Sequence, residues 1–143
     1  MAAVVAIPAG FYLLVKPRST GDGGLVEVAE LKRLPAGKPQ ELVYTRTRVD
    51  GWKTVKERTT AWVVKSAQDE IVAYSPQCTH LGCAYHWEDA GEKFVCPCHN
   101  SEFGLDGKVL AGPAPRALDR LVAKVEDGKL LIGGKQEASY WHG

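Results

Sequence analysis

All four cysteines of the chain and three of its four histidines lie in one stretch, residues 78–101. It reads CTHLGCAYHWEDAGEKFVCPCHNS and contains two short loops, separated by twelve residues, that each hold two cysteines and one histidine next to them. Thiolate sulfur and imidazole nitrogen are the donors that proteins use for zinc, copper and iron–sulfur clusters. The spacing therefore predicts one metal or cluster site built from both loops.

The two loops are similar to those of a known family. CTHLGC, with Cys78 and His80, and CPCHNS, with Cys96 and His99, resemble the Rieske [2Fe–2S] proteins. The resemblance is to the branch found in quinol-oxidising cytochrome bc and bf complexes of the prokaryotic, menaquinol type. It implies one [2Fe–2S] cluster, with Cys78 and Cys96 on the inner iron and His80 and His99 on the outer iron.

The resemblance also assigns the remaining cysteine of each loop, Cys83 and Cys98, to a disulfide. Ring-hydroxylating dioxygenases and their Rieske ferredoxins share the ligands but lack this extra pair, which favours the quinol-oxidising branch. Because a persistent disulfide requires an oxidising compartment, the soluble head is expected on the extracytoplasmic face of a membrane.

The function implied by the resemblance is the transfer of one electron together with one proton. Imidazole ligands in place of thiolates remove negative charge from around the irons. A unit charge about 6 Å from an iron changes the free energy of its reduction by roughly 3 kcal/mol at an effective dielectric near 20, so the reduced state becomes easier to reach. His80 and His99 each keep a second ring nitrogen that can bind a proton. The expected donor is a quinol, with His99 as its favoured hydrogen-bond partner. The expected protein partners are a cytochrome b-type subunit and a c-type cytochrome that accepts the electron.

Three further residues have roles implied by the resemblance. The Ser101 hydroxyl is expected to donate to a bridging sulfide and to raise the potential. Leu81 is expected to form an exposed apolar tip that shields docked quinol from water. Phe103 stands where high-potential members have a tyrosine that donates to a cysteine sulfur, which predicts a lower potential and menaquinol as the donor. The proline-rich segment 112–115 is expected to cover the cluster.

Other interpretations of the same residues remain open. Structural zinc also takes mixed cysteine and histidine ligands, but it leaves the second cysteine of each loop unassigned. A scaffold of two disulfides leaves the histidines unexplained. The small Rieske subunit of an exported molybdenum oxidase, such as arsenite oxidase, would share the cluster loops but relay electrons within a fixed heterodimer, without quinol.

The rest of the chain has to position these loops, and its patterns predict strands. A length of 143 residues suggests one domain, and the net charge of +1 gives no reason to expect nucleic acid as a partner. Strands are expected at 25–28, 41–46, 60–65, 70–74, 118–125 and 129–132, with hairpin turns at Asp50–Gly51 and Asp127–Gly128. The predicted fold is all-β, a Rieske-type antiparallel β sandwich over residues 25–143. A cluster-binding subdomain is inserted in it at about 75–116.

The first 24 residues are expected to lie outside that domain. Residues 1–15 form an apolar run that is shorter than the roughly 20 residues of a membrane-spanning helix, and Lys16 and Arg18 follow it. We interpret residues 1–18 as the remnant of a truncated membrane anchor, with a buried strand or an unstructured end as the alternatives. Residues 19–24 are polar and glycine-rich, which is typical of a flexible hinge.

The remaining aromatic, histidine and basic residues receive no chemical role. The tryptophans are expected to pack in the core or at sheet edges: Trp52, Trp62, Trp87 and Trp141. No role is assigned to His86 or His142. The basic residues of segment 53–58 are expected to form a solvated face.

Overall fold

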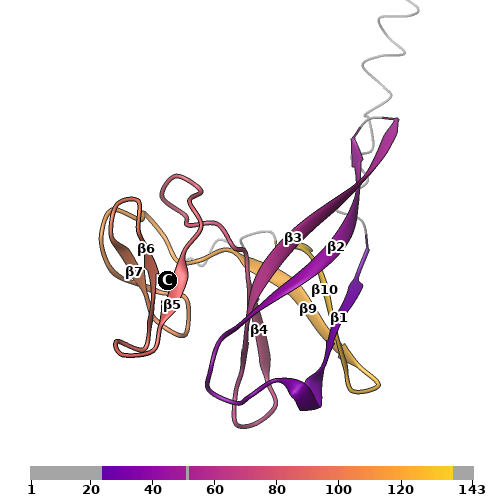
Figure 1. Cartoon of the computed structure of the whole chain (residues 1–143), viewed down its shortest axis with the longest axis horizontal. Coiled ribbons are helices and arrows are strands. Elements are labelled where there is room, and N and C mark those ends of the chain that lie inside the picture. The colour runs from indigo at the N-terminus through magenta and orange to yellow at the C-terminus, as the bar shows by residue number, and fades with distance from the viewer. Residues whose placement is uncertain (1–23, 51, 137–143) are drawn as a thin grey trace, which may run out of the picture.

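The computed structural model describes residues 24–50 and 52–136, which form two antiparallel sheets (Figure 1). The described residues contain ten strands and one short 3₁₀ helix. In chain order these are β1 (Val26–Glu30), η1 (Leu31–Arg33), β2 (Gln40–Asp50), β3 (Lys53–Lys65), β4 (Ile71–Tyr74), β5 (His86–Glu88), β6 (Lys93–Cys96), β7 (Ser101–Phe103), β8 (Val109–Ala111), β9 (Arg120–Glu126) and β10 (Lys129–Lys135). The all-β prediction is confirmed.

The larger sheet has six strands in the order β1-β10-β9-β4-β3-β2, and the smaller one has four in the order β5-β6-β7-β8. The two edge strands of the larger sheet, β1 and β2, contact each other, so this sheet nearly closes into a barrel. All six predicted strands are present with shifted ends. The four short strands of the smaller sheet were not predicted. Within the described ranges we find no helix with the length and apolar character needed to cross a bilayer.

The interior of the larger sheet is filled by alternating apolar residues of its strands. Leu130 and Ile132 of β10 are fully buried, and so is Ala61 of β3. Alternation with period two places such residues on one face of a strand, where they exclude water. This core fixes the base on which the cysteine loops are carried.

A second core joins the two sheets, and Phe94 of β6 lies at its centre. The Phe94 ring is packed edge-on against Trp62 at 5.5 Å and Tyr74 at 6.0 Å, both from the larger sheet. It also contacts Tyr85 at 5.4 Å and Trp87 at 4.9 Å between ring centroids. Edge-to-face pairs of this kind each add about 0.5–1.5 kcal/mol beyond the area that they bury. The aromatic cluster therefore holds the smaller sheet against the larger one.

The packing prediction for the tryptophans is correct in part. Trp62 is buried and Trp87 is half-buried against Phe94. For Trp52 the prediction is wrong, because its side chain is 100% exposed. It lies in the turn between β2 and β3, which extend beyond the rest of their sheet, so the tip of this hairpin has no core to pack on (Figure 1). Trp141 lies outside the described residues.

The predicted membrane-anchor remnant at 1–18 also lies outside the described residues. The same holds for the predicted hinge at 19–24, except for Gly24. The basic residues of segment 53–58, Lys53, Lys56 and Arg58, are exposed as predicted, and they belong to β3.

Candidate metal centre

The first cysteine loop is a tight turn closed by backbone hydrogen bonds. The amide of Cys78 donates to the carbonyl of Cys83 at 2.8 Å, and the amide of Gly82 donates to the carbonyl of Cys78 at 2.9 Å. Gly82 has a φ of +79°, a left-handed conformation that glycine adopts without a steric cost. The turn leaves Leu81 exposed, with 69% of its surface accessible to solvent. Leu81 is therefore an exposed apolar residue of this turn, and its role toward quinol stays a prediction.

The second cysteine loop joins β6 to β7. Cys96 is the last residue of β6 and pairs directly with Ser101, the first residue of β7. Residues 97–100 between them are exposed, and Asn100 closes the turn with a φ of +55°. The hairpin thus fixes Cys96 and Ser101 side by side, and both are buried.

The two loops are joined covalently by the predicted disulfide between Cys83 and Cys98. The thiols of Cys78 and Cys96 are free and buried. The sulfur of Cys96 lies within 4.8 Å of both disulfide sulfurs. Because disulfide sulfurs carry no negative charge, this trio is not a ligand set of three thiolates.

The free thiols are buried more deeply than the histidines. Cys78 is 3% exposed and Cys96 is 2% exposed, whereas His80 is half-buried and His99 is exposed. The two imidazole rings meet edge to face, with centroids 4.7 Å apart. The two loops, which are separated by twelve residues, thus supply two buried sulfur donors and two more exposed nitrogen donors.

Two buried polar atoms of the site have no hydrogen-bond partner among the described residues. They are Nδ1 of His80 and the hydroxyl oxygen of Ser101. Buried polar groups without a partner are rare in native proteins and point to a missing ligand or ion. A group that takes one nitrogen from His80 and one hydrogen bond from Ser101 fits both atoms, and the donor set of the site fits an iron–sulfur cluster.

The surroundings of Cys78 act on its thiol in opposite directions. Burial is the largest influence and, with the neighbouring Cys96 thiol, it raises the pKa of the Cys78 thiol. The backbone amide of His80 acts to lower that pKa, as does the Ser101 hydroxyl, which faces the sulfur without a hydrogen bond of normal geometry. These two donors are placed to stabilise a thiolate at this position.

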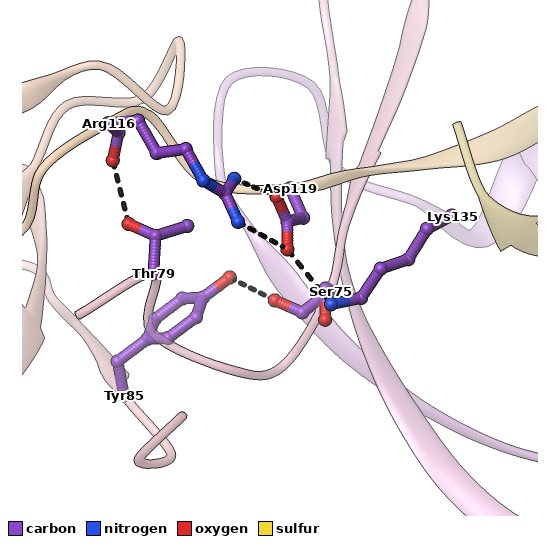
Figure 2. A network of polar contacts seen from close by, with 6 residues as sticks. All are labelled: Ser75, Thr79, Tyr85, Arg116, Asp119 and Lys135. Atoms are coloured by element: carbon purple, nitrogen blue, oxygen red, sulfur yellow. Dashed lines mark hydrogen bonds and ion pairs between the residues drawn. The ribbon is translucent and has the colours of Figure 1, made fainter. Parts of the chain in front are cut away.

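The proline-rich segment 112–115 lies directly against the second cysteine loop. A Cβ atom added at Gly112 would come within 2.5 Å of both the Asn100 carbonyl oxygen and the Ser101 Cα. Arg116, the residue after this segment, contacts the first loop, because the Thr79 hydroxyl donates to the Arg116 carbonyl at 2.7 Å (Figure 2). The segment thus lies against the second loop, and the residue that follows it is fastened to the first.

An ion-pair network continues from this segment to the larger sheet (Figure 2). The Arg116 guanidinium binds the carboxylate of Asp119, which also accepts from Lys135 of β10 at 2.9 Å. Partial burial acts to raise the pKa of the Asp119 carboxyl, but Arg116 and Lys135 outweigh it and the pKa is lowered. Such a carboxylate stabilises the fold above its unfolded-state pKa, and the contribution is lost as the pH falls through the lowered value.

Replacing Gly112 by alanine is expected to loosen the covering segment. The residue has a φ of +89°, and the added Cβ would meet backbone atoms that cannot rotate away. We expect the free energy of unfolding to fall by more than about 2 kcal/mol. Urea titration measures the change. Gly128→Ala is the matched control, because Gly128 has a φ of +74° but open space around it. Equal losses in the two variants would contradict the close contact.

Comparison with known proteins decides the family. The family model of the Rieske [2Fe–2S] domain matches residues 24–126. The chain belongs to the Rieske family. Its cofactor is a [2Fe–2S] cluster, and structural zinc is excluded as the interpretation of the two loops.

Two curated relatives of this Rieske chain cover most of its length. The chain is 38% identical over 138 residues to the menaquinol:cytochrome c reductase iron–sulfur subunit of Bacillus subtilis, covering 93% of this chain and 81% of that protein. It is 34% identical over 134 residues to the cytochrome b6-f complex iron–sulfur subunit 3 of a Nostoc species, covering 92% of this chain and 74% of that protein. These relatives are iron–sulfur subunits of the bc and bf type, the branch that the cysteine loops indicated.

Among solved structures, the ferredoxin of carbazole 1,9a-dioxygenase from Nocardioides aromaticivorans is similar in fold. The TM-score is 0.52 at 22% identity, covering 79% of this chain and 100% of that one. At this identity the likeness shows the Rieske fold alone.

The ion pairs of Asp119 with Arg116 and Lys135 were not predicted from the sequence. Arg116 and Asp119 were not singled out, since charged residues in a loop are usually solvated. The proximity of Lys135 depends on the pairing of β9 with β10, which continues to Lys135 opposite Leu121.

Proposed function

We propose that this Rieske chain is the electron-transfer subunit of a quinol-oxidising complex. It takes one electron and one proton from a quinol, which we identify as menaquinol, and passes the electron to a c-type cytochrome. The observation that carries the proposal is the pairing of two buried free thiols with two imidazoles at the rim of the same site. When bound there, the [2Fe–2S] cluster supplies a one-electron carrier.

The assignment of ligands follows from burial and from the unpartnered atoms. Cys78 and Cys96 are the two free thiols in the described chain, and we assign them to the inner iron. His80 and His99 we assign to the outer iron, with Nδ1 of His80 as the metal-binding nitrogen because it is buried and unpartnered. We regard residues 75–116, which include the smaller sheet and both loops, as the cluster-binding subdomain.

The two histidines are also the groups that handle the proton. An imidazole bound to a metal through one nitrogen can gain or lose a proton at the other. His99 is exposed, so its second nitrogen can accept a hydrogen bond from the hydroxyl of a docked quinol. Leu81, which follows His80 in the first loop, presents an exposed apolar side chain that we expect to exclude water from the contact. Quinol oxidation thereby releases its proton at the rim where the electron enters.

The partners and the location of the chain are inferred from the relatives and from the disulfide. The Bacillus relative is named for menaquinol and cytochrome c, and the Nostoc relative for the cytochrome b6-f complex. We infer a cytochrome b-type subunit as the partner that completes the quinol site. The Cys83–Cys98 disulfide supports a head on the extracytoplasmic face, attached to the membrane through residues 1–18 and the hinge at 19–24.

Replacing Phe103 by tyrosine is expected to raise the midpoint potential. Phe103 is fully buried in the core that contains both free cysteines, so a hydroxyl here is added to the same core. A hydrogen bond that favours the reduced state by about 1 kcal/mol raises the potential by about 40 mV. Ser101→Ala is expected to lower the potential, because it removes a buried donor. Redox titration measures both, and an unchanged or lowered midpoint in the tyrosine variant would contradict the role of this position.

The proposal is tested by iron analysis and redox-titrated EPR on the purified chain. We expect two irons per chain and a rhombic signal on reduction, with an average g value below that of the free electron. The midpoint should fall by about 59 mV per pH unit over the pH range in which one proton accompanies the electron. A midpoint that is independent of pH would rule out proton-coupled transfer. Reduction by menaquinol in a complex with the cytochrome b-type subunit tests the donor.

A further inference from the structure

The β2–β3 hairpin extends as an arm beyond its sheet. The five pairs from Arg46–Glu57 to Asp50–Lys53 form this arm, and β3 pairs with β4 only from Trp62 onward. Every residue of the arm whose side chain is described is exposed, except Arg46 and Glu57, which pair with each other at 3.1 Å. An isolated two-stranded hairpin is only marginally stable in water. The arm is therefore a surface that a partner would stabilise.

The arm and its base are basic and have an aromatic tip. Four exposed cations have no ion-pair partner within residues 24–50 and 52–136, namely Arg48, Lys53, Lys56 and Arg58. Segment 46–58 carries five basic and two acidic residues in sequence, which gives it a net charge of +3 although the chain as a whole carries +1. The fully exposed Trp52 lies at the tip, and the exposed Val49 and Val55 lie behind it.

The cations lie on both faces of the arm. Residues directly opposite in a hairpin share a face, and successive pairs alternate. The register places Arg48 and Lys53 on one face, and Lys56 and Arg58 on the other. A protein groove would contact one face of such a ribbon. A layer of anionic headgroups surrounds the tip and contacts both.

The arm projects from the same end of the six-stranded sheet at which its first strand, β1, begins. Neighbouring strands of the six-stranded sheet are antiparallel throughout, so β1 runs opposite to β2. β1 therefore begins at the end of the sheet from which the arm projects (Figure 1). The apolar run at 1–15 and its basic flank precede β1 in sequence.

We propose that the arm docks on the anionic lipid headgroups of the membrane to which the chain is attached. Trp52 lies at the boundary with the hydrocarbon, where tryptophan is enriched in membrane proteins. Arg48 and Lys56 lie within roughly 10 Å of the turn at 3.4 Å per residue, which is close to headgroup depth. Each cation near an anionic surface strengthens binding about fivefold. The inference rests on the proposed membrane attachment, and it adds a second contact to it.

The test uses the full chain with its cluster, mixed with vesicles of phosphatidylglycerol and phosphatidylcholine whose acyl chains are brominated. Flotation reports attachment of the chain. The emission of Trp52, taken as the difference between the chain and its Trp52→Phe variant, reports insertion of the tip. We expect quenching of this emission in the anionic vesicles, and weaker quenching in phosphatidylcholine alone or at high salt.

A matched pair of variants distinguishes the effect of the arm's own cations from the effect of the total positive charge of the chain. Neutralising Arg48, Lys53, Lys56 and Arg58 with glutamine is expected to lower the ratio of docked to undocked arm several hundredfold, roughly fivefold per residue, and so to abolish the quenching. The control replaces Lys32, Arg33, Lys124 and Lys129, which lie toward the opposite end of the sheet, where Leu31 donates to the Gly128 carbonyl. It should leave the quenching intact.

The outcomes distinguish failure of the proposed docking of the arm from failure of the proposed membrane attachment. Flotation without quenching of Trp52 overturns the docking of the arm and leaves the attachment in place. Quenching that survives in the arm variant, or that is equal in phosphatidylcholine alone, overturns the role of anionic headgroups. A chain that does not float overturns both. EPR of the same samples reports the cluster independently of either result.

Discussion

Replacing Cys96 by alanine is expected to abolish binding of the cluster. Cys96 is one of the two free thiols in the described residues, and it is buried against the disulfide and Ser101. No other free thiolate among them can take its place, because Cys83 and Cys98 are bonded to each other. Iron content should fall from two per chain to background, and the EPR signal of the reduced state should disappear with it. The same result is expected for Cys78→Ala.

The control for this prediction removes two cysteines instead of one. In Cys83→Ser combined with Cys98→Ser, all four proposed ligands remain, so two irons should still bind at low temperature. If the double variant lost its iron as completely as Cys96→Ala under these conditions, the division of the cysteines into ligands and a disulfide would be wrong.

The cysteine loops could be predicted from the sequence because their chemistry is local. Cys78 and His80 lie in one turn, and Cys96 and His99 in another, so residue types and spacing carry most of the information. The disulfide followed from the resemblance. The hairpin at Asp50 and Gly51 was predicted for the same local reason, since turn residues determine it.

What joins the loops to the rest of the molecule could not be predicted in this way. The hydrogen bond from Thr79 to Arg116 spans 37 residues, and the pair of Asp119 and Lys135 spans 16. The first contact depends on how the chain after β8 returns to the first cysteine loop, and the second on the pairing of β9 with β10.

The prediction missed the strands of the smaller sheet and the exposure of Trp52 for a different reason. β5, β7 and β8 have three residues each, which is too short for alternation to stand out from the surrounding loops. For Trp52, a large apolar side chain was assumed to be buried, whereas the hairpin extends past the core. Exposure of this kind indicates an interaction surface rather than a core position.

Removing the disulfide is expected to destabilise the chain strongly even though it leaves the ligands in place. Cys83 and Cys98 are 15 residues apart, and closing a loop of that size removes conformational entropy from the unfolded chain equivalent to about 3 kcal/mol. The double serine variant should therefore lose about 3 kcal/mol in the free energy of unfolding, and dithiothreitol should have a similar effect on the unsubstituted chain. Denaturant titration of the cluster-free proteins measures this loss without a contribution from the metal.

Binding of the cluster should change how much stability is lost when the disulfide is removed. With the cluster bound, both loops are joined through the metal as well as through the disulfide, so the second link closes a loop that is already closed. The loss on removing the disulfide should then be smaller in the iron-loaded chain than in the cluster-free chain. Release of iron from the double variant during heating should nonetheless begin at a lower temperature, because the loops are then held by the cluster and by the contacts of residues 112–116 without the covalent link. Equal losses with and without iron would mean that the cluster and the disulfide do not constrain the same two loops.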